Sequence, residues 1–267
     1  MRARESVRKG LRAVLLWPRV SLAALLAATV ALLSLSAAWH HAVQALHVAA
    51  RSGDGSFVGV AIGAFLFGSG FAALLGNVTR TVALTAYSPP SPSSASGARS
   101  PFVDGLRRTP AMITLQAIEL TVCGMLAFGA VAILVRHAKG LPPGRAALFS
   151  LLVLLPPGAL GIVQVAVTRV AMTLAARGQP PAVALVRGYD LVARRFPSLL
   201  GLAALLFVRT LPLTVPALVA AMAAIGASPR VTVALDLVRA VCLSAAALWG
   251  YAALAVWVGS DDELAGG

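Results

Sequence analysis

Charged residues are scarce in this sequence: only 12% of its 267 residues are Asp, Glu, Lys or Arg, whereas 59% are hydrophobic. A soluble domain is usually about half apolar and about one quarter charged. The chain therefore has too few charges to cover a surface that faces water, and lipid must face much of it. We expect a single integral membrane domain over residues 1–267, with no appended soluble domain.

Cysteine and acidic residues are also scarce. Cys123 and Cys242 both lie inside apolar runs, which excludes a disulfide framework and favours two buried small side chains. Nine acidic residues stand against 22 basic ones, so the net charge is +13. In a soluble protein this balance would suggest nucleic acid, but here the arginines lie between apolar runs. We therefore expect no nucleic-acid partner, and we expect contact with the lipid bilayer and its anionic headgroups instead.

Long apolar runs are what the sequence has in abundance. A spanning helix needs about 20 apolar residues, and only helices or closed barrels satisfy every backbone group in lipid. These runs are longer and more uniformly apolar than barrel strands. We predict an all-α, polytopic membrane helix bundle with amphipathic interfacial helices. Its six transmembrane helices cover Val20–Ala38, Phe57–Leu75 (continuing as helix to Tyr87), Ala111–Val135, Ala146–Val167, Ser198–Ile225 and Val231–Val258.

The basic residues also predict how the chain is oriented. Fifteen of them flank the connections on the side of the N-terminus, against five on the opposite side. Since basic residues concentrate in cytoplasmic loops, we expect both termini in the cytoplasm, in a bacterial inner membrane. The basic start and the apolar run after it also fit a signal peptide, but Val20–Ala38 is longer than the usual apolar core of about 7–15 residues. We interpret it as a retained first helix.

A short motif recurs in the chain. Val78–Ala83 reads V-T-R-T-V-A, and Val167–Met172 reads V-T-R-V-A-M at the end of another span. A glycine and then a proline also precede the first, third and fifth spans, as Gly10/Pro18, Gly105/Pro110 and Gly188/Pro197. We predict three parallel units of two spans each, near 1–90, 98–181 and 182–260, with a flexible Ser/Pro-rich linker at 88–100. The sixth span matches its counterparts only in hydrophobicity, and chance similarity of Ala/Leu-rich helices is the alternative explanation.

The Gly-to-Pro entries before three spans carry a resemblance to a known group of proteins. The layout resembles the six-helix membrane domain associated with bacterial glycerophosphodiester phosphodiesterases and several similar bacterial membrane protein families. The resemblance covers most of the chain and implies a membrane domain without catalysis of its own. Because this chain has no phosphodiesterase domain, the resemblance transfers no site residue.

Three polar residues fall inside the predicted spans. Glu119 lies in the third span with Gln116 one turn before it, and Arg209 lies midway along the fifth. An ionisable group at membrane depth costs roughly 2.5–3.5 kcal/mol on insertion scales, so it normally faces the bundle interior and pairs. We hypothesise that Glu119 and Arg209 form a buried pair. It would be either a substrate or proton site, or a contact that fixes helix packing.

Other polar residues give weaker signals. His40 and His47 are seven residues apart on the predicted outer face, with Asp54 as the nearby acid, which falls short of a typical zinc set. Asp236 and Arg239 are three apart near the start of the sixth span, which favours a local pair at the membrane edge. We expect no metal site, no cofactor and no catalytic residue.

Two functions from different classes remain open. The first is a non-enzymatic membrane domain that organises lipids or partner proteins, with its amphipathic helices on anionic headgroups. The second is a small transporter or permease subunit with a buried polar site in the third to fifth spans. Prolines inside spans favour the second, because broken helices are where transporters place their sites. These prolines are Pro156, Pro157, Pro212 and Pro216.

Overall fold

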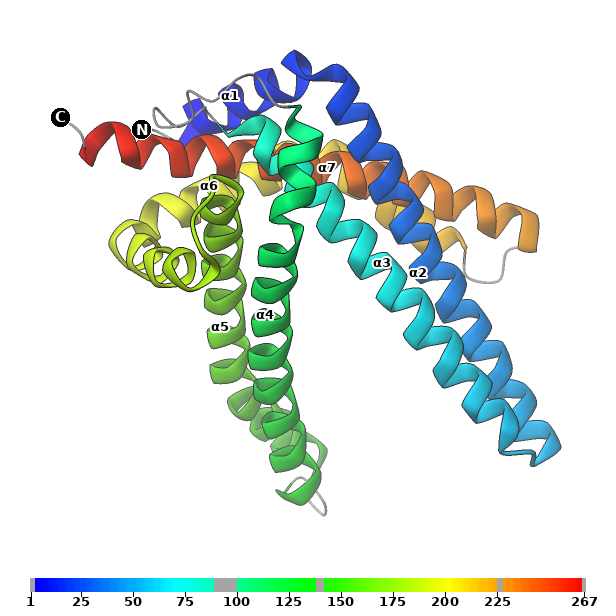
Figure 1. Cartoon of the computed structure of the whole chain (residues 1–267). Helices are drawn as coiled ribbons and strands as arrows, with labels where there is room; N and C mark the ends of the chain where they lie inside the picture. The colour runs from blue at the N-terminus through cyan, green and yellow to red at the C-terminus, as the bar shows by residue number, and fades with distance from the viewer. Residues whose placement is uncertain (1–2, 89–99, 138–141, 225–227, 266–267) are drawn as a thin grey trace. The chain divides into compact units, whose positions relative to one another are not determined.

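The computed structural model describes residues 3–88, 100–137, 142–224 and 228–265, and every regular element in these ranges is a helix (Figure 1). Among the helices in these described ranges, six are long and apolar enough to cross a membrane, and α1 is the exception. This confirms the predicted all-α, multi-spanning bundle. The helices are α1 (Ala3–Leu16), α2 (Pro18–Ser52), α3 (Ser56–Tyr87), α4 (Pro101–His137), α5 (Pro143–Ala176), α6 (Pro181–Ala223) and α7 (Pro229–Ala265).

Most of the helices extend beyond the apolar runs that predict them. α3 ends at Tyr87 as expected, but α2 continues well past Ala38. It ends only where Gly53 adopts a left-handed conformation (φ 70°) and its N–H donates to the Ala49 carbonyl, a common helix ending that suits glycine. Lipid thickness limits an apolar run, whereas local backbone chemistry ends a helix. Most of the predicted linker at 88–100 lies outside the described residues.

Each entry proline follows a short helical segment. Proline disfavours the helical conformation of the residue before it and lacks an N–H to donate. Trp17, just before Pro18, is accordingly non-helical (φ −115°, ψ 59°) and separates α1 from α2. Arg195 kinks α6 shortly before Pro197 (φ −119°, ψ 22°). Pro110, by contrast, lies inside the continuous α4.

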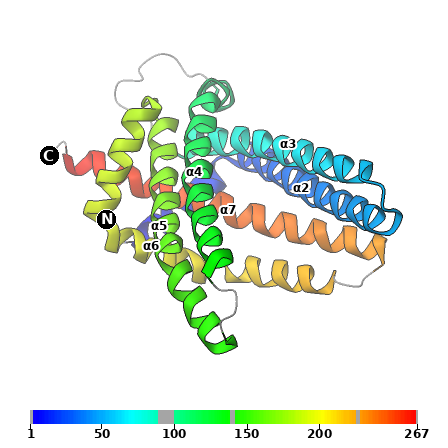
Figure 2. The same ribbon diagram turned by 90° about the horizontal axis from the view of Figure 1, so that it is seen from below.

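The chain divides into two compact units, and the first consists of Met1–Thr109 with Pro197–Gly267. Within this unit α2 packs along α3, and α7 packs against α1, α2 and α3 (Figure 2). A Cβ atom at Gly68 would lie 2.2 Å from the Cβ of Ala38, so the missing side chain lets α2 and α3 approach closely. The core of the unit includes Leu84 and Trp257, and Trp257 Nε1 donates to Ser198 Oγ at 3.0 Å.

The second unit is Pro110–Phe196, which holds most of α4, all of α5 and the first part of α6. Its buried residues concentrate at the C-terminal end of α5, where every residue from 170 to 176 is buried. The most apolar stretch of α5, by contrast, has none of its residues buried inside the protein. Apolar side chains that the fold leaves uncovered are what a lipid-facing helix presents.

Three glycines pack against the ends of spans, each in an equivalent way. A Cβ atom at Gly105 would lie 2.8 Å from Val82 Cγ2, and one at Gly188 would lie 3.3 Å from Ala171 Cβ. Val82 and Ala171 occupy the same position when the two copies of the repeated motif are aligned. A Cβ atom at Gly10 would lie 2.6 Å from the backbone nitrogen of Ala253 in α7.

The Gly10 contact suggests where a third copy of the motif would be. If Ala253 matches Val82 and Ala171, then residues 249–254 align with the motif, and Tyr251 stands where the other copies have Arg80 and Arg169. Arg80 Nε donates to the Tyr251 hydroxyl at 3.2 Å, and the guanidinium lies 5.6 Å from the ring centroid. The three-unit repeat stays a prediction, and these contacts support it.

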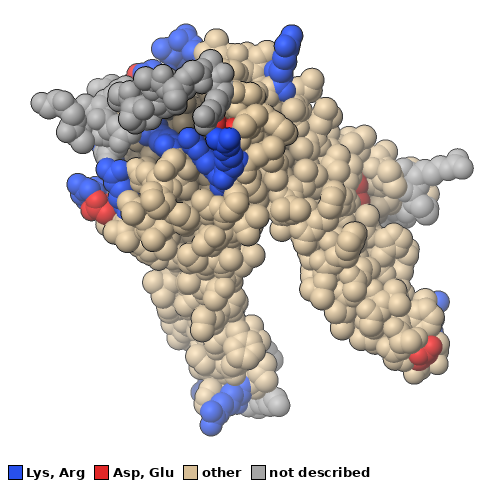
Figure 3. Space-filling model, viewed as in Figure 1, with Lys and Arg blue, Asp and Glu red and all other residues tan. Residues whose placement is uncertain are grey.

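Basic side chains are unevenly distributed in the first unit. Figure 3 shows blue atoms over α1 and the neighbouring helix ends, whereas the paired α2 and α3 are uncharged along most of their visible length. Acidic atoms appear at the far tip of this pair, where Asp54 lies in the turn between α2 and α3. The charges thus lie toward the two ends of the α2–α3 pair and leave an apolar band between them.

Candidate functional site

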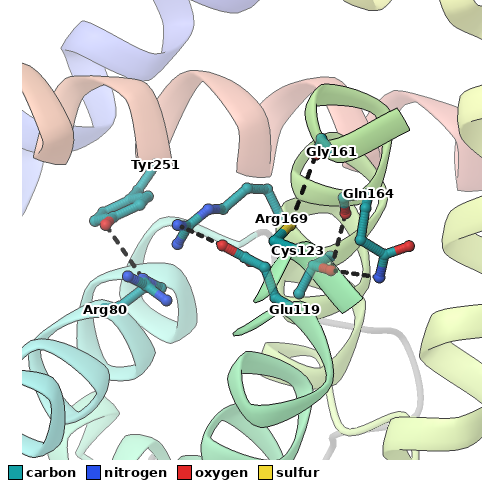
Figure 4. Close-up of polar contacts among 8 residues, drawn as sticks. Arg80, Glu119, Cys123, Gly161, Gln164, Arg169 and Tyr251 are labelled. Carbon is teal, nitrogen blue, oxygen red and sulfur yellow. Dashed lines mark hydrogen bonds and ion pairs between the residues drawn. The ribbon is translucent and has the colours of Figure 1, made fainter. Parts of the chain in front are cut away.

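Glu119 is the buried carboxylate of the second unit. Only 7% of the residue is exposed, and its Oε1 lies 3.3 Å from Nη2 of Arg169 on α5 (Figure 4). Its second oxygen, Oε2, is buried and has no hydrogen-bond partner among the described residues. Gln116, one turn earlier on α4, is half-buried. Glu119 and Gln116 thus lie one turn apart on α4, and a shared polar site stays a prediction.

Glu119 has an ion-pair partner that the sequence analysis did not consider, and its proposed pair with Arg209 stays a hypothesis. Glu119 forms its ion pair with Arg169, the arginine of the second repeat motif, rather than with Arg209, which belongs to the other unit. The reason is topological: α4 and α5 are consecutive helices, and Arg169 lies close to the C-terminal end of α5, where it faces the first half of α4. The sequence analysis counted Arg169 among the basic residues that flank a connection and did not weigh it as a partner of Glu119.

A hydrogen-bonded chain joins α5 to the first part of α6 near this ion pair. The Tyr189 hydroxyl donates to Oε1 of Gln164, and Gln164 Nε2 donates to Thr168 Oγ1 at 3.4 Å. Thr168 in turn donates to the Gln164 carbonyl at 2.9 Å. Gln164 and Thr168 are buried, so these bonds satisfy polar groups that would otherwise be costly in an apolar environment.

Arg209 lines a basic cleft in the first unit. The cleft measures about 680 Å³, and it is formed by α1, the second part of α6 and α7. Arg4 and Arg8 of α1 also line it, as does Trp249, whose Nε1 donates to the Val7 carbonyl at 3.2 Å. The midspan arginine therefore lines the same cleft as two arginines of the amphipathic first helix. We name this cleft the basic cleft.

The basic cleft has a net positive charge. Glu5 is the one acidic residue among the described residues that line it, and Lys9 lies 2.9 Å from its carboxylate. The hydrogen bond from Lys9, together with the lysine charge, lowers the pKa of Glu5 below its ordinary value. Arg4, Arg8 and Arg209 make no ion pair within 4.0 Å among the residues that the structure describes. Three guanidinium groups thus remain available to an anion.

A second polar cluster lies elsewhere in the first unit. Asp236 is buried, and Arg239 Nη2 lies 3.1 Å from its Oδ1, which confirms the predicted local pair. Ser36 of α2 donates to Oδ2 at 2.8 Å, and His40 Nε2 lies 3.6 Å from the same oxygen. Arg239 also donates to Ser36 Oγ at 3.2 Å. The structure therefore joins α2 to α7 through a four-residue polar cluster.

This cluster opens into a cleft with mostly apolar walls. The cleft measures about 710 Å³ and is lined by residues of α2, α3, α6 and α7. Trp39 and Phe65 form an edge-to-face pair beside it, with ring centroids 6.1 Å apart. An apolar pocket with a few convergent polar groups is the usual form of a small-molecule site. We name it the Asp236 cleft.

The sequence predicted some of these groups and missed others. Glu119 and Arg209 stand out because each is ionisable inside an apolar run. Ser36 and His40 gave no comparable signal, since serine is common in spanning helices and His40 lies at the end of an apolar run. Arg169 could have been found from its recurrence in the V-T-R motif.

No protein-family model matches this chain, and no curated protein or solved structure matches it either. Its function must therefore be inferred from its sites.

Proposed function

We propose that this chain is a non-enzymatic membrane domain that binds anionic lipid headgroups through its basic cleft. The observation that carries the proposal is the meeting of Arg4, Arg8 and Arg209 around a cleft whose lining carboxylate is held by Lys9. Guanidinium groups bind phosphate oxygens in pairs and stay charged at any physiological pH. α1 precedes the first span and is amphipathic, as is typical of a helix in the headgroup plane.

The expected selectivity follows from the charge. A basic residue near an anionic membrane surface contributes about 1 kcal/mol to lipid binding. Three arginines would contribute about 3 kcal/mol, which corresponds to a preference on the order of 100-fold over a neutral lipid. Salt would weaken this preference, because exposed charges are screened within about 10 Å at 0.1 M ionic strength.

Native mass spectrometry of the gently extracted full chain tests the proposal. Wild-type protein should retain phosphatidylglycerol in preference to phosphatidylcholine, and Arg209→Gln should lower that retention about fivefold. Arg12→Gln removes the same charge from α1 at a position that does not line the cleft, so its retention should stay close to wild type. Equal losses in Arg209→Gln and Arg12→Gln would refute a specific site and leave only general charge attraction.

A soluble competitor separates a lipid site from a phosphate site. Glycerol 3-phosphate carries the same anion without acyl chains. If the cleft binds a membrane lipid, millimolar glycerol 3-phosphate should not displace phosphatidylglycerol. Displacement would instead assign the cleft to a free phosphate ligand and contradict the lipid proposal.

We place the chain in a bacterial inner membrane with both termini in the cytoplasm. The excess of basic residues on the side of α1 supports this orientation, and the resemblance to membrane domains of glycerophosphodiester phosphodiesterases fits a lipid-related role. A reporter that is active only in the periplasm should be inactive when fused after Ser96 and active when fused in the turn at Gly53. Activity after Ser96 would contradict the orientation.

A small transporter or permease subunit is the second candidate, and Glu119 favours it. Its buried Oε2 has no hydrogen-bond partner among the described residues, and such a group is costly unless a ligand or proton satisfies it. Gln116 lies one turn away on the same helix. Pro156 and Pro157 interrupt the backbone bonding of the adjacent α5.

The same mass spectrometry experiment tests this second candidate with Glu119→Ala and Glu119→Gln. A small molecule retained by wild type and lost from both variants would support a buried substrate site. Glu119→Gln preserves the shape of the side chain and can still accept a hydrogen bond from Arg169. Equal retention in all three proteins would leave the Glu119–Arg169 pair as a packing contact and contradict the transporter.

A further inference from the structure

The Asp236 cleft carries both signs of charge at one end of an apolar groove. Asp236 and Arg239 face each other, and His40 adds a ring nitrogen beside the carboxylate. We propose that this cleft binds a lipid with a zwitterionic headgroup. Asp236 holds the headgroup ammonium, and Arg239 holds its phosphate. This site is separate from the basic cleft and does not depend on the anionic-lipid proposal.

Asp236 keeps acceptor capacity for an ammonium group. A carboxylate offers about four acceptor positions. Arg239 takes one on Oδ1, Ser36 takes one on Oδ2, and His40 lies beside Oδ2 at 3.6 Å. Oδ1 therefore has room for a second donor. The contacts from Ser36 and Arg239 hold the carboxylate in one orientation, so little ordering is needed when the ligand binds.

Arg239 can reach a phosphate without leaving Asp236. Only Nη2 of Arg239 is used in the bonds to Asp236 and Ser36, and a guanidinium has five N–H donors. A third of the Arg239 side chain is exposed, as is about half of the His40 side chain. Arg239 therefore presents donors to the cleft next to the carboxylate that would hold the ammonium, and the ring of His40 lies beside that carboxylate.

The walls of the cleft fit the rest of such a lipid. Trp39 is 58% exposed and forms the edge-to-face pair with Phe65. The face of a tryptophan attracts a nearby ammonium through its ring electrons. Leu35 and Leu243 also line the cleft and are exposed, and they provide an apolar surface for acyl chains. An ionic ligand without a tail would leave these walls uncovered.

The two clefts of the first unit differ in the charge that they offer. The basic cleft presents three arginines, whereas the Asp236 cleft balances one arginine with one carboxylate. Both clefts use α7, at Trp249 and Asp236. These residues are separated by about 20 Å along the helix, at 1.5 Å per residue. One chain thus offers an anionic-lipid site and a zwitterionic-lipid site about two thirds of a membrane core apart.

Photocrosslinking of the full chain in lipid nanodiscs tests the proposal. The probe is phosphatidylethanolamine with a diazirine in one acyl chain, and crosslinked peptides are mapped by mass spectrometry. We expect labelling around Trp39 and Leu243 that unlabelled phosphatidylethanolamine suppresses at least fivefold more effectively than phosphatidylglycerol does. Equal suppression by the two lipids would overturn the assignment of a zwitterionic headgroup.

Two variants in the cleft test whether the labelling depends on Asp236 and Trp39. Asp236→Asn should reduce labelling of the cleft at least fivefold, while crosslinks elsewhere on the lipid-facing helices stay unchanged and report that the protein is folded. Trp39→Leu changes only an exposed wall and should lower labelling without loss of thermal stability, which keeps the test valid if Asp236→Asn does not fold. Arg209→Gln lies in the other cleft and should leave the labelling of the Asp236 cleft unchanged. Unchanged labelling in both cleft variants would overturn the proposal.

Discussion

Replacing Gly10 with alanine should destabilise the protein, although the same change usually stabilises a helix. Gly10 lies in the middle of α1, where alanine is favoured over glycine by about 1 kcal/mol. A Cβ atom there would lie 2.6 Å from the nitrogen and 2.7 Å from the Cα of Ala253. These are backbone atoms of α7, so no side-chain rotation can relieve the contact. α1 would have to move away from α7.

The size of the effect follows from that movement. Ordinary contact begins near 3.4 Å, so the helices must separate by close to 1 Å. Overpacking of this kind costs about 1–3 kcal/mol. The same shift would lengthen the hydrogen bond from Trp249 Nε1 to the Val7 carbonyl, now 3.2 Å, at a cost of about 1 kcal/mol. After the gain in helix propensity, we expect a net loss of about 1–3 kcal/mol.

Thermal unfolding in mild detergent, followed by circular dichroism, measures this loss. One kcal/mol shifts the melting temperature of a chain of this size by about 2–4 °C, so Gly10→Ala should melt about 2–12 °C lower. Gly250→Ala is the matched control, because Gly250 lies in α7 and a Cβ atom there would meet nothing within 4 Å. The control should raise stability by about 0.5–1 kcal/mol.

A Gly10→Ala protein that melts at or above the wild-type temperature would refute the reasoning. It would mean that α1 does not pack closely against α7 in the folded protein. The same result would also contradict the geometry of the basic cleft, because Arg4 and Arg8 line one cleft with Arg209 only when α1 lies against α6 and α7.

Two further predictions test other parts of the fold. Gly188→Ala should destabilise less than Gly10→Ala in the same melting assay, because its Cβ atom would meet the Val167 carbonyl at 3.0 Å, a milder contact; a larger loss would contradict the ranking. The hydrogen bond from the Ser56 amide lowers the pKa of Asp54 in the folded protein, so its stabilisation is complete above the unfolded pKa and lost as the pH falls through the folded one. The difference in melting temperature between wild type and Asp54→Ala should therefore be constant above about pH 5 and shrink as the pH falls below about 4, and a difference independent of pH would contradict it.

The sequence predicts the spans well because lipid imposes a simple rule. Six runs of apolar residues predict the six helices that the structure shows to be long and apolar enough to cross a membrane. The helix ends are less predictable, as α2 shows: the apolar run stops at Ala38, but the backbone stays helical until the left-handed Gly53. Hydropathy reports the environment of side chains, whereas the end of a helix depends on backbone hydrogen bonds.

The candidate sites could be predicted only in part. An ionisable side chain inside an apolar run is costly wherever it packs, so Glu119 and Arg209 are visible without a structure. Their partners are not visible, because a partner is decided by which helices are neighbours. Glu119 forms an ion pair with Arg169 on the adjacent α5, whereas Arg209 lines a cleft together with arginines of α1.

By itself, the sequence determined that this chain is a multi-spanning membrane protein, since it has too few charged residues to cover a surface that faces water and has six long apolar runs. It also marked Gly10, Gly105 and Gly188 as recurring features. Only the tertiary structure decided that each of these glycines contacts the end of a span, and that Ser36 and His40 join Asp236 across two helices. The physical reason is that burial in lipid acts on each segment separately, whereas close packing and polar pairing act between segments that the chain brings together only when it folds.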